Sequence, residues 1–135
     1  MNPYLYVTVL ILSIVLILVF AFGCTSFDAY EFPPEAYESK LEWAADNTPT
    51  QNCFMWSRTV HDKLKSVGED SIILAIERYP IDHAIVCDEL NCADNGTLGF
   101  FPRTELSHYK ILGSIVFLSD VPMIDNGQKL TRVRY

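Results

Sequence analysis

The first 27 residues of the chain lack any charged side chain, and no lysine or arginine precedes Lys40. All 17 acidic and 10 basic side chains lie in the remaining part, which carries the net charge of −7. The chain also lacks a basic stripe, a glycine-rich phosphate loop and internal repeats. Because nucleic-acid binding relies on Lys and Arg to neutralise phosphates, we expect no nucleic-acid partner.

Cysteine is scarce as well, with 4 residues in a chain of 135. This number is too small for a disulfide framework, and the cysteines do not form the paired motifs of a zinc site. We therefore expect no metal and no cofactor. Cys87 and Cys92 are spaced to bridge across a turn, which makes them the candidate disulfide.

Residues 4–22 are almost continuously apolar. About 20 helical residues, rising 1.5 Å each, match the roughly 30 Å hydrocarbon core of a bilayer. A buried core helix is a poor alternative, because this run is apolar on every face and the domain is small. The pattern predicts a transmembrane helix, with residues 4–22 as the contact with a membrane.

Residues 1–27 also have a second interpretation, as a signal segment. Gly23-Cys24 resembles the processing site of a bacterial lipoprotein, with Cys24 as the candidate lipidated residue. Signal peptides normally carry a basic residue before the apolar run, and this chain has none, which favours the uncleaved anchor. No basic residue follows the run until Lys40, which favours a single-pass membrane protein with its domain outside the cytoplasm, periplasmic or extracellular.

After a linker at residues 28–34, residues 35–135 are long enough for one small domain. The pattern predicts two helices and then strands that pair antiparallel, an α+β fold. The helices are expected over 35–45 and from either Thr48 or Asn52 to Gly68, the strands over 71–76, 83–90, 97–101, 110–118 and 129–135, and a turn over 91–96.

Cys53 and His83 are the candidate pair for thiol chemistry. Cys53 opens an amphipathic helix, where free N–H groups and the helix dipole favour a thiolate. His83 opens a strand, and a histidine beside a thiol takes its proton. Each residue alone is more often structural, so the pair carries the prediction. The backbone N–H of Cys53, with the Gln51 or Asn52 side chain, is the candidate oxyanion donor, although both side chains also suit helix capping.

The segment Asn-Cys-Phe-x-x-Ser-Arg-x-x-x-Asp-x-Leu, followed by a glycine, an apolar strand and Asp-His-Ala-Ile-Val, resembles a known family. It is similar to the transglutaminase-like branch of the papain-like cysteine peptidases, of the bacterial or phage type, over Thr50 to Pro102. The resemblance implies a papain-like core and a Cys–His–Asp site. It also implies acyl transfer from amide bonds through a thioester on Cys53.

The third residue of such a site is not evident in the sequence. In the family it lies late on the strand that follows the histidine, and residues 99–102 of this chain, Gly-Phe-Phe-Pro, contain no carboxylate. The substitutes are Asp94 or Asn95 in the predicted turn, and Asp120 after the fourth strand. The simpler interpretations are that residues 94–96 form a hairpin turn and that Asp120 ends a strand.

Two functions are therefore predicted. The first is a membrane-anchored thiol hydrolase or acyltransferase that acts on peptide or peptidoglycan amide bonds. The second is a catalytically inactive, membrane-tethered binding module or envelope accessory protein of the same fold, motivated by the missing carboxylate.

Overall fold

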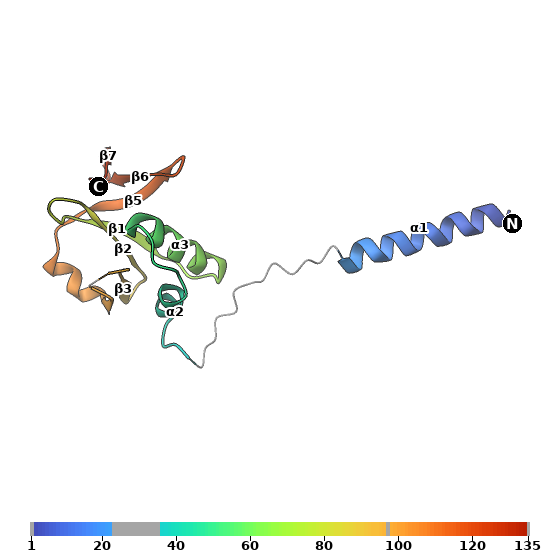
Figure 1. Ribbon diagram of the computed structural model, residues 1–135, viewed down its shortest axis with the longest axis horizontal. Coiled ribbons are helices and arrows are strands. Elements are labelled where there is room, and N and C mark those ends of the chain that lie inside the picture. The colour runs from blue at the N-terminus through green and yellow to red at the C-terminus, as the bar shows by residue number, and fades with distance from the viewer. Residues whose placement is uncertain (1, 23–35, 97, 135) are drawn as a thin grey trace.

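The computed structural model describes residues 2–22, 36–96 and 98–134. Its domain contains a seven-stranded antiparallel sheet of order β4-β3-β2-β1-β5-β6-β7 (Figure 1). The strands are β1 (Ile72–Ile76), β2 (His83–Cys87), β3 (Asn91–Ala93), β4 (Phe100–Pro102), β5 (Ile111–Leu118), β6 (Val121–Asp125) and β7 (Leu130–Arg132). The helices are α1 (Pro3–Phe22), α2 (Lys40–Asp46), α3 (Cys53–Ser66) and the 3-10 helix η1 (Arg103–His108). The predicted α+β domain is thus present.

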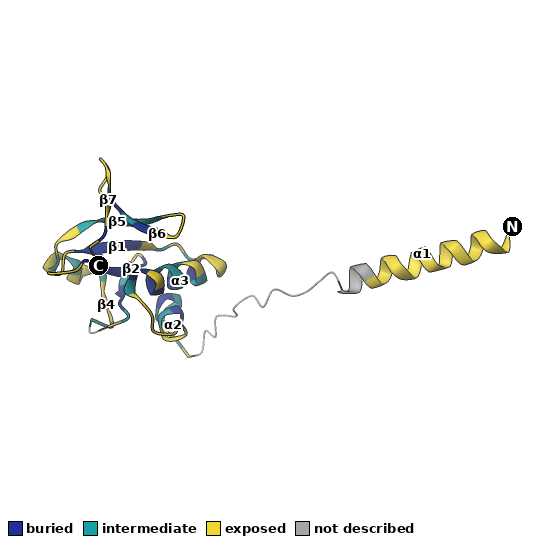
Figure 2. Cartoon of the chain, turned by 45° about the horizontal axis from the view of Figure 1, so that its top comes forward, coloured by how far each residue is buried: buried dark blue, intermediate teal, exposed yellow. Residues whose placement is uncertain are grey.

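The central strands β1 and β2 are buried on both faces (Figure 2). Alternate side chains such as Ala75 and Ala84 join a core with α2 and α3, whereas Leu74 and Ile85 pack on the other face. Successive side chains of a strand point to opposite faces of the sheet, and here both faces are covered. This explains why these strands are continuous apolar runs in the sequence.

Helix α3 begins at Cys53 because Asn52 caps it. The Asn52 side chain accepts a hydrogen bond from the N–H of Phe54 at 2.9 Å, which satisfies a donor that lacks an intrahelical partner. Of the two predicted starts, Thr48 is wrong, since its hydroxyl donates to the Ala44 carbonyl behind it. Gly68, with φ of 75°, follows the end of the helix as predicted.

Helix α2 starts five residues later than the predicted start at residue 35. Ser39 is its N-cap, and its hydroxyl accepts from the N–H of Glu42 at 3.1 Å. Ser39 and Glu42 have the spacing of a capping box, a stronger start signal than the prolines on which the prediction relied. The predicted linker at 28–34 lies outside the described residues.

The prediction of a transmembrane helix is corrected by the structure. The apolar run does fold as α1, but in the described part of the chain no helix combines the length and the hydropathy needed to cross a membrane. The predicted single-pass membrane localisation, with the domain outside the cytoplasm, rested on this span and is corrected with it.

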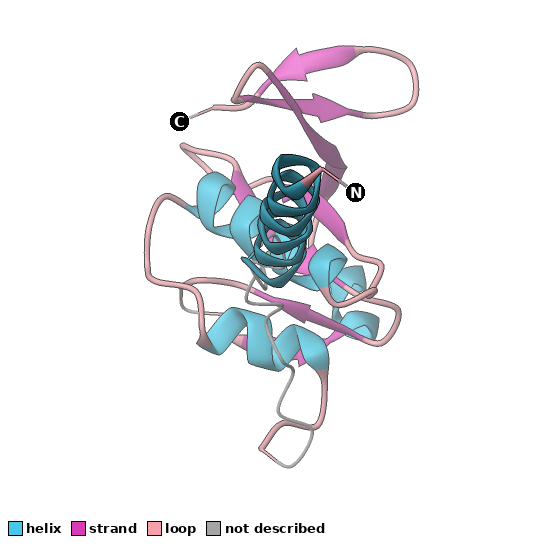
Figure 3. Cartoon of the chain, turned by 90° about the vertical axis from the view of Figure 1, so that its right-hand side faces the viewer, coloured by secondary structure: helices cyan, strands magenta, loops and turns pink. Residues whose placement is uncertain are grey.

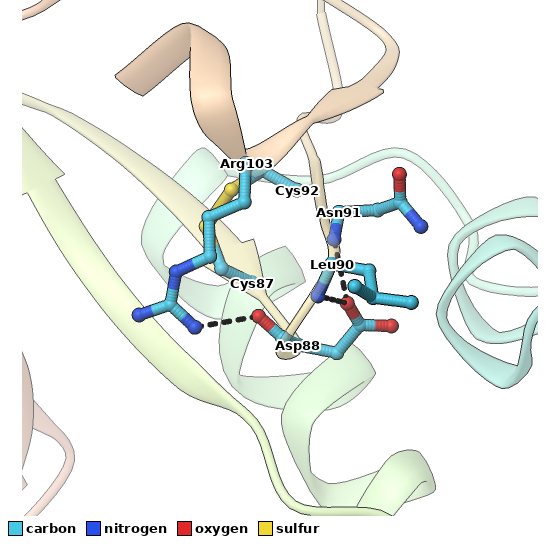
Figure 4. Close-up of a disulfide and its surroundings, with 6 residues drawn as sticks. All are labelled: Cys87, Asp88, Leu90, Asn91, Cys92 and Arg103. Atoms are coloured by element: carbon cyan, nitrogen blue, oxygen red, sulfur yellow. Dashed lines mark hydrogen bonds between the residues drawn. A yellow bond between two sulfur atoms is a disulfide. The ribbon is translucent and has the colours of Figure 1, made fainter. Parts of the chain in front are cut away.

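The β2–β3 hairpin differs from the prediction in a way that matters for the site. The strand predicted over 83–90 ends at Cys87, and the first half of the predicted turn at 91–96 is strand β3. Asp88 makes the turn instead: its carboxylate accepts from the N–H groups of Leu90 and Asn91 at 2.8 and 2.7 Å (Figure 4). The extended pairing of β2 with β3 ends at Val86 and Ala93.

Cys87 and Cys92 face each other in this hairpin and form a disulfide (Figure 4). Both residues are fully buried, and the Arg103 guanidinium covers the turn by donating to the Asp88 carbonyl at 2.6 Å. The disulfide therefore joins the two strands on either side of the tight turn.

The C-terminal part of the sheet contains one strand that the sequence pattern did not predict. Strand β6 pairs with β5 and β7, and it includes Pro122, which argues against a strand in sequence. The strands predicted over 97–101, 110–118 and 129–135 are present in shortened or shifted form as β4, β5 and β7. In Figure 3 the C-terminal strands stand at the top of the view, beside the marked C-terminus.

Candidate active site

Cys53 is the first residue of α3, at the end of the helix that lies against β2. It is the free cysteine of the described residues and is half-buried. A thiol in the first turn of a helix lies near backbone N–H groups that have no acceptor within the helix. Cys53 is therefore held where a negative charge on sulfur is favoured, while it remains accessible.

His83 is the first residue of β2 and pairs with Ile76 at the end of β1. Its side chain is 12% exposed, and the neighbouring Cys53 thiol contributes to the rise in its pKa. The Nε2 atom of the ring is paired with Oδ1 of Asp94. Because an imidazole has two nitrogens, Nδ1 is the atom left for the thiol.

Asp94 directly follows β3, and its side chain is completely buried. Besides pairing with His83, its carboxylate accepts from the N–H of Leu98 at 3.0 Å, and its own N–H donates to the Gly99 carbonyl at 2.9 Å. These bonds fix the carboxylate in a tight loop behind the imidazole. Asp94 thus lies directly after β3, the strand that follows the strand of the histidine.

The three side chains alter one another's pKa values in a consistent direction. Hydrogen bonding to Asp94, and then to Cys53, raises the pKa of His83 from 6.5 to about 9. Burial raises the pKa of Cys53, but the bonds to His83 and to the Ala84 N–H outweigh it, so the net shift is downward. The pKa of Asp94 is also lowered, because the bonds from His83 and from the Leu98 N–H outweigh burial. At neutral pH these shifts favour an imidazolium beside an ionised carboxylate, and they move the thiol toward its ionised form.

The predicted oxyanion side chains are engaged elsewhere. The Gln51 side-chain amide donates to the Thr59 hydroxyl at 3.1 Å, along the side of α3. The Asn52 side-chain oxygen caps the helix. Asn52 therefore acts as a helix cap. Of the predicted oxyanion donors, the backbone N–H of Cys53 is the one that remains for an oxyanion.

Asn95 lies next to Asp94 but acts on the backbone. Its side-chain amide donates to the carbonyl of Gln51 at 2.7 Å. This bond joins the loop that carries the acid to the segment that precedes the nucleophile. Asn95 is therefore positioned to hold two parts of the site together rather than to contact the imidazole.

Asp120 pairs with Arg58 and not with His83, which corrects its candidacy as the orienting acid. It lies in the turn between β5 and β6 with φ of 67°, its side chain is 80% exposed, and it pairs with Arg58 at 2.6 Å. The strand-end interpretation is the right one. Cys24, the candidate for lipidation, lies outside the described residues.

The sequence pattern did not predict the ion pair between Asp82, the residue before His83, and Arg134. Asp82 is 2% exposed and binds Arg134, a residue far away in the chain. The signal available in the sequence was a single acid beside His83, which does not reveal a partner 52 positions later. Within the described ranges, no group of three His, Cys, Asp or Glu side chains is placed to hold a metal ion.

Comparisons of the chain with family models, curated proteins and solved structures find no match. They give no support to an assignment as a protease or a transglutaminase, and the family resemblance stays a prediction. The argument for a function therefore rests on the geometry of Cys53, His83 and Asp94.

Proposed function

We propose that the chain is a cysteine-dependent hydrolase or acyltransferase that acts on amide bonds. The observation that supports the proposal is the pairing of a buried Asp94 carboxylate with Nε2 of His83, whose ring and the Cys53 thiol shift each other's pKa. A thiol, a base and an orienting acid on three separate elements form the arrangement that nucleophilic catalysis needs.

In the proposed mechanism the Cys53 thiolate attacks the carbonyl carbon of an amide. The backbone N–H of Cys53 donates to the oxygen as it becomes negative. The protonated His83 gives its proton to the departing amine, which leaves a thioester on sulfur. Neutral His83 then accepts a proton from water or from an incoming amine, which releases the acid or a new amide. Asp94 keeps the ring in the required orientation throughout.

The proposed substrates are peptide-type amides, with peptidoglycan cross-links as one class among them. The competing idea of an inactive binding module was motivated by a missing carboxylate. Asp94 supplies a carboxylate to His83, so that motivation is removed.

The proposal is tested by trapping the thioester. The protein is incubated with an activated ester, 4-nitrophenyl acetate, and with a peptide 4-nitroanilide, and acylated protein is measured by intact mass. We expect one acyl group on Cys53 and none on the Cys53→Ala variant. If the wild type forms no adduct with either compound, or if Cys53→Ala is acylated equally, the proposal is wrong.

Two aspartates of the chain offer a matched comparison for the same assay. Asp94→Asn should slow acylation about 100-fold, because an orienting acid commonly contributes 10²–10⁴-fold. Asp120→Asn should leave the rate unchanged, since that carboxylate is exposed and pairs with Arg58 rather than with His83. Equal rates in both variants would remove Asp94 from the mechanism.

A further inference from the structure

The segment before the catalytic histidine is held by the C-terminal end of the described chain. The buried carboxylate of Asp82 accepts three hydrogen bonds from Arg134. The backbone N–H binds Oδ2 at 2.8 Å, while Nε and an Nη bind Oδ1 at 3.0 and 2.7 Å. In return the Asp82 N–H donates to the Arg134 carbonyl at 2.9 Å. Four bonds thus join one residue to the other.

This contact lies where β2 would otherwise be weakest. Residues 77–81, which connect β1 to β2, are all exposed, so the first residue of β2 follows a segment with little packing. Strand ends that follow such segments open most easily. His83 is that first residue, and its cross-strand partner Ile76 is also the last residue of its own strand. Asp82, the residue directly before His83, is therefore the nearest residue ahead of the strand that is held in place by hydrogen bonds.

The carboxylate of Asp82 needs this partner. A buried carboxylate without hydrogen bonds is costly, and a forked guanidinium satisfies it in a defined geometry. Arg134 also lies 3.9 Å from Glu77, and Glu77 pairs with Lys110 at 2.9 Å. Charged side chains next to the ends of β1 and β5 therefore pair in the same region of the sheet.

We propose that Arg134 is a positioning residue for the thiol site: by fixing Asp82 it holds the backbone of His83 in register, so that the ring reaches Cys53 and Asp94 together. This inference rests on the proposed function of the site. It adds a residue from the far end of the described chain that touches neither the thiol nor a substrate.

The test compares Arg134→Met with Arg132→Met in the full chain. Arg132 lies two residues away in β7 and is exposed, so its variant removes the same charge from the same segment. The rate of Cys53 carboxymethylation by iodoacetamide is measured from pH 5 to 9, together with the urea midpoint of unfolding. In the wild type we expect the reaction to set in at a lower pH than for an ordinary thiol, since the imidazolium beside Cys53 favours the thiolate.

Arg134→Met should slow the reaction at pH 6.5 about tenfold and move the inflection of the profile toward that of an ordinary thiol, because small misplacements of reacting groups are costly. Arg134→Lys should recover part of the rate, and Arg132→Met should match the wild type. If Arg134→Met does not fold, Arg134→Lys is judged by the same shift of the profile.

A wild-type profile in Arg134→Met, whether or not its urea midpoint falls, would overturn the positioning role and leave the proposed function intact. A wild-type protein that itself reacts as an ordinary thiol would instead overturn the proposed function, and the inference with it.

Discussion

At the scale of single residues, the account depends on which carboxylate reaches the imidazole. Of the two candidate aspartates, Asp120 pairs with Arg58 on the surface, and Asp94 pairs with His83. Only a buried acid polarises its partner strongly, since water screens an exposed one. The complete burial of the Asp94 side chain is therefore as important as its distance from the ring.

Asp94→Asn should also change stability in a manner that depends on pH. The pKa of Asp94 is lowered in the folded state, so its contribution is present above the ordinary value of 3.8 and is lost as the pH falls through the folded value. We expect the variant to be about 1–3 kcal/mol less stable at pH 7, the usual cost of removing a buried polar partner. Its deficit should shrink as the pH is lowered below about 4.

Urea unfolding at pH 7 and at pH 3.5 measures this difference, with Asp120→Asn as the control. The control should cost at most about 1 kcal/mol at either pH, as exposed ion pairs do. A deficit for Asp94→Asn that is equal at both pH values would mean that the carboxylate is not ionised against His83.

At the scale of elements, the long periodic segments were predictable and the short ones were not. The helix that begins at Cys53 and the buried strands β1 and β2 follow from apolar spacing and from caps that are local in sequence. Strand β3 has three residues, too few for a period, and the turn residues Asp94, Asn95 and Gly96 follow it directly. It is a strand because it pairs with β2 on one side and with β4 on the other, and pairing with β4 is not visible in the local sequence.

The wrong prediction of a turn in place of β3 explains why the sequence did not single out the acid of the site. With β3 read as a turn, the strand after the histidine was taken to be residues 97–101, which have no carboxylate. The pair Cys53 and His83 was named from local signals, a helix start and a strand start. The partner of the histidine depends on hairpin register, which the sequence pattern does not contain.

The hairpin should lose stability when its disulfide is removed. The bond closes a loop with a sequence separation of 5, and chain entropy for so short a loop predicts a loss of about 2 kcal/mol. We therefore expect the double variant Cys87→Ala/Cys92→Ala to unfold at a lower urea concentration. The wild type in dithiothreitol should approach the same midpoint, while its midpoint without reductant stays higher. Identical midpoints in all three samples would show that the bond does not stabilise the hairpin.

At the scale of the whole molecule, the site is assembled from segments far apart in the chain. Cys53, His83 and Asp94 come from α3, β2 and the loop after β3, and the Asp82–Arg134 contact adds the end of the described chain. None of the side chains of α1 that the structure describes, at residues 3–18, belongs to either core cluster of the domain. The properties of the site therefore depend on the cooperative fold of the sheet and of the two helices that cover it.

The imidazole titration of His83 is the most direct test of this account. It is followed by NMR of the ring carbons, with His83→Gln used to assign the signal. In the folded protein the ring should stay protonated to about pH 9, because Asp94 and the Cys53 thiolate stabilise its charge. In urea it should titrate near its ordinary value of 6.5. A folded-state ring that titrates at 6.5 or below would mean that no thiolate–imidazolium pair forms, and the proposed chemistry would be contradicted.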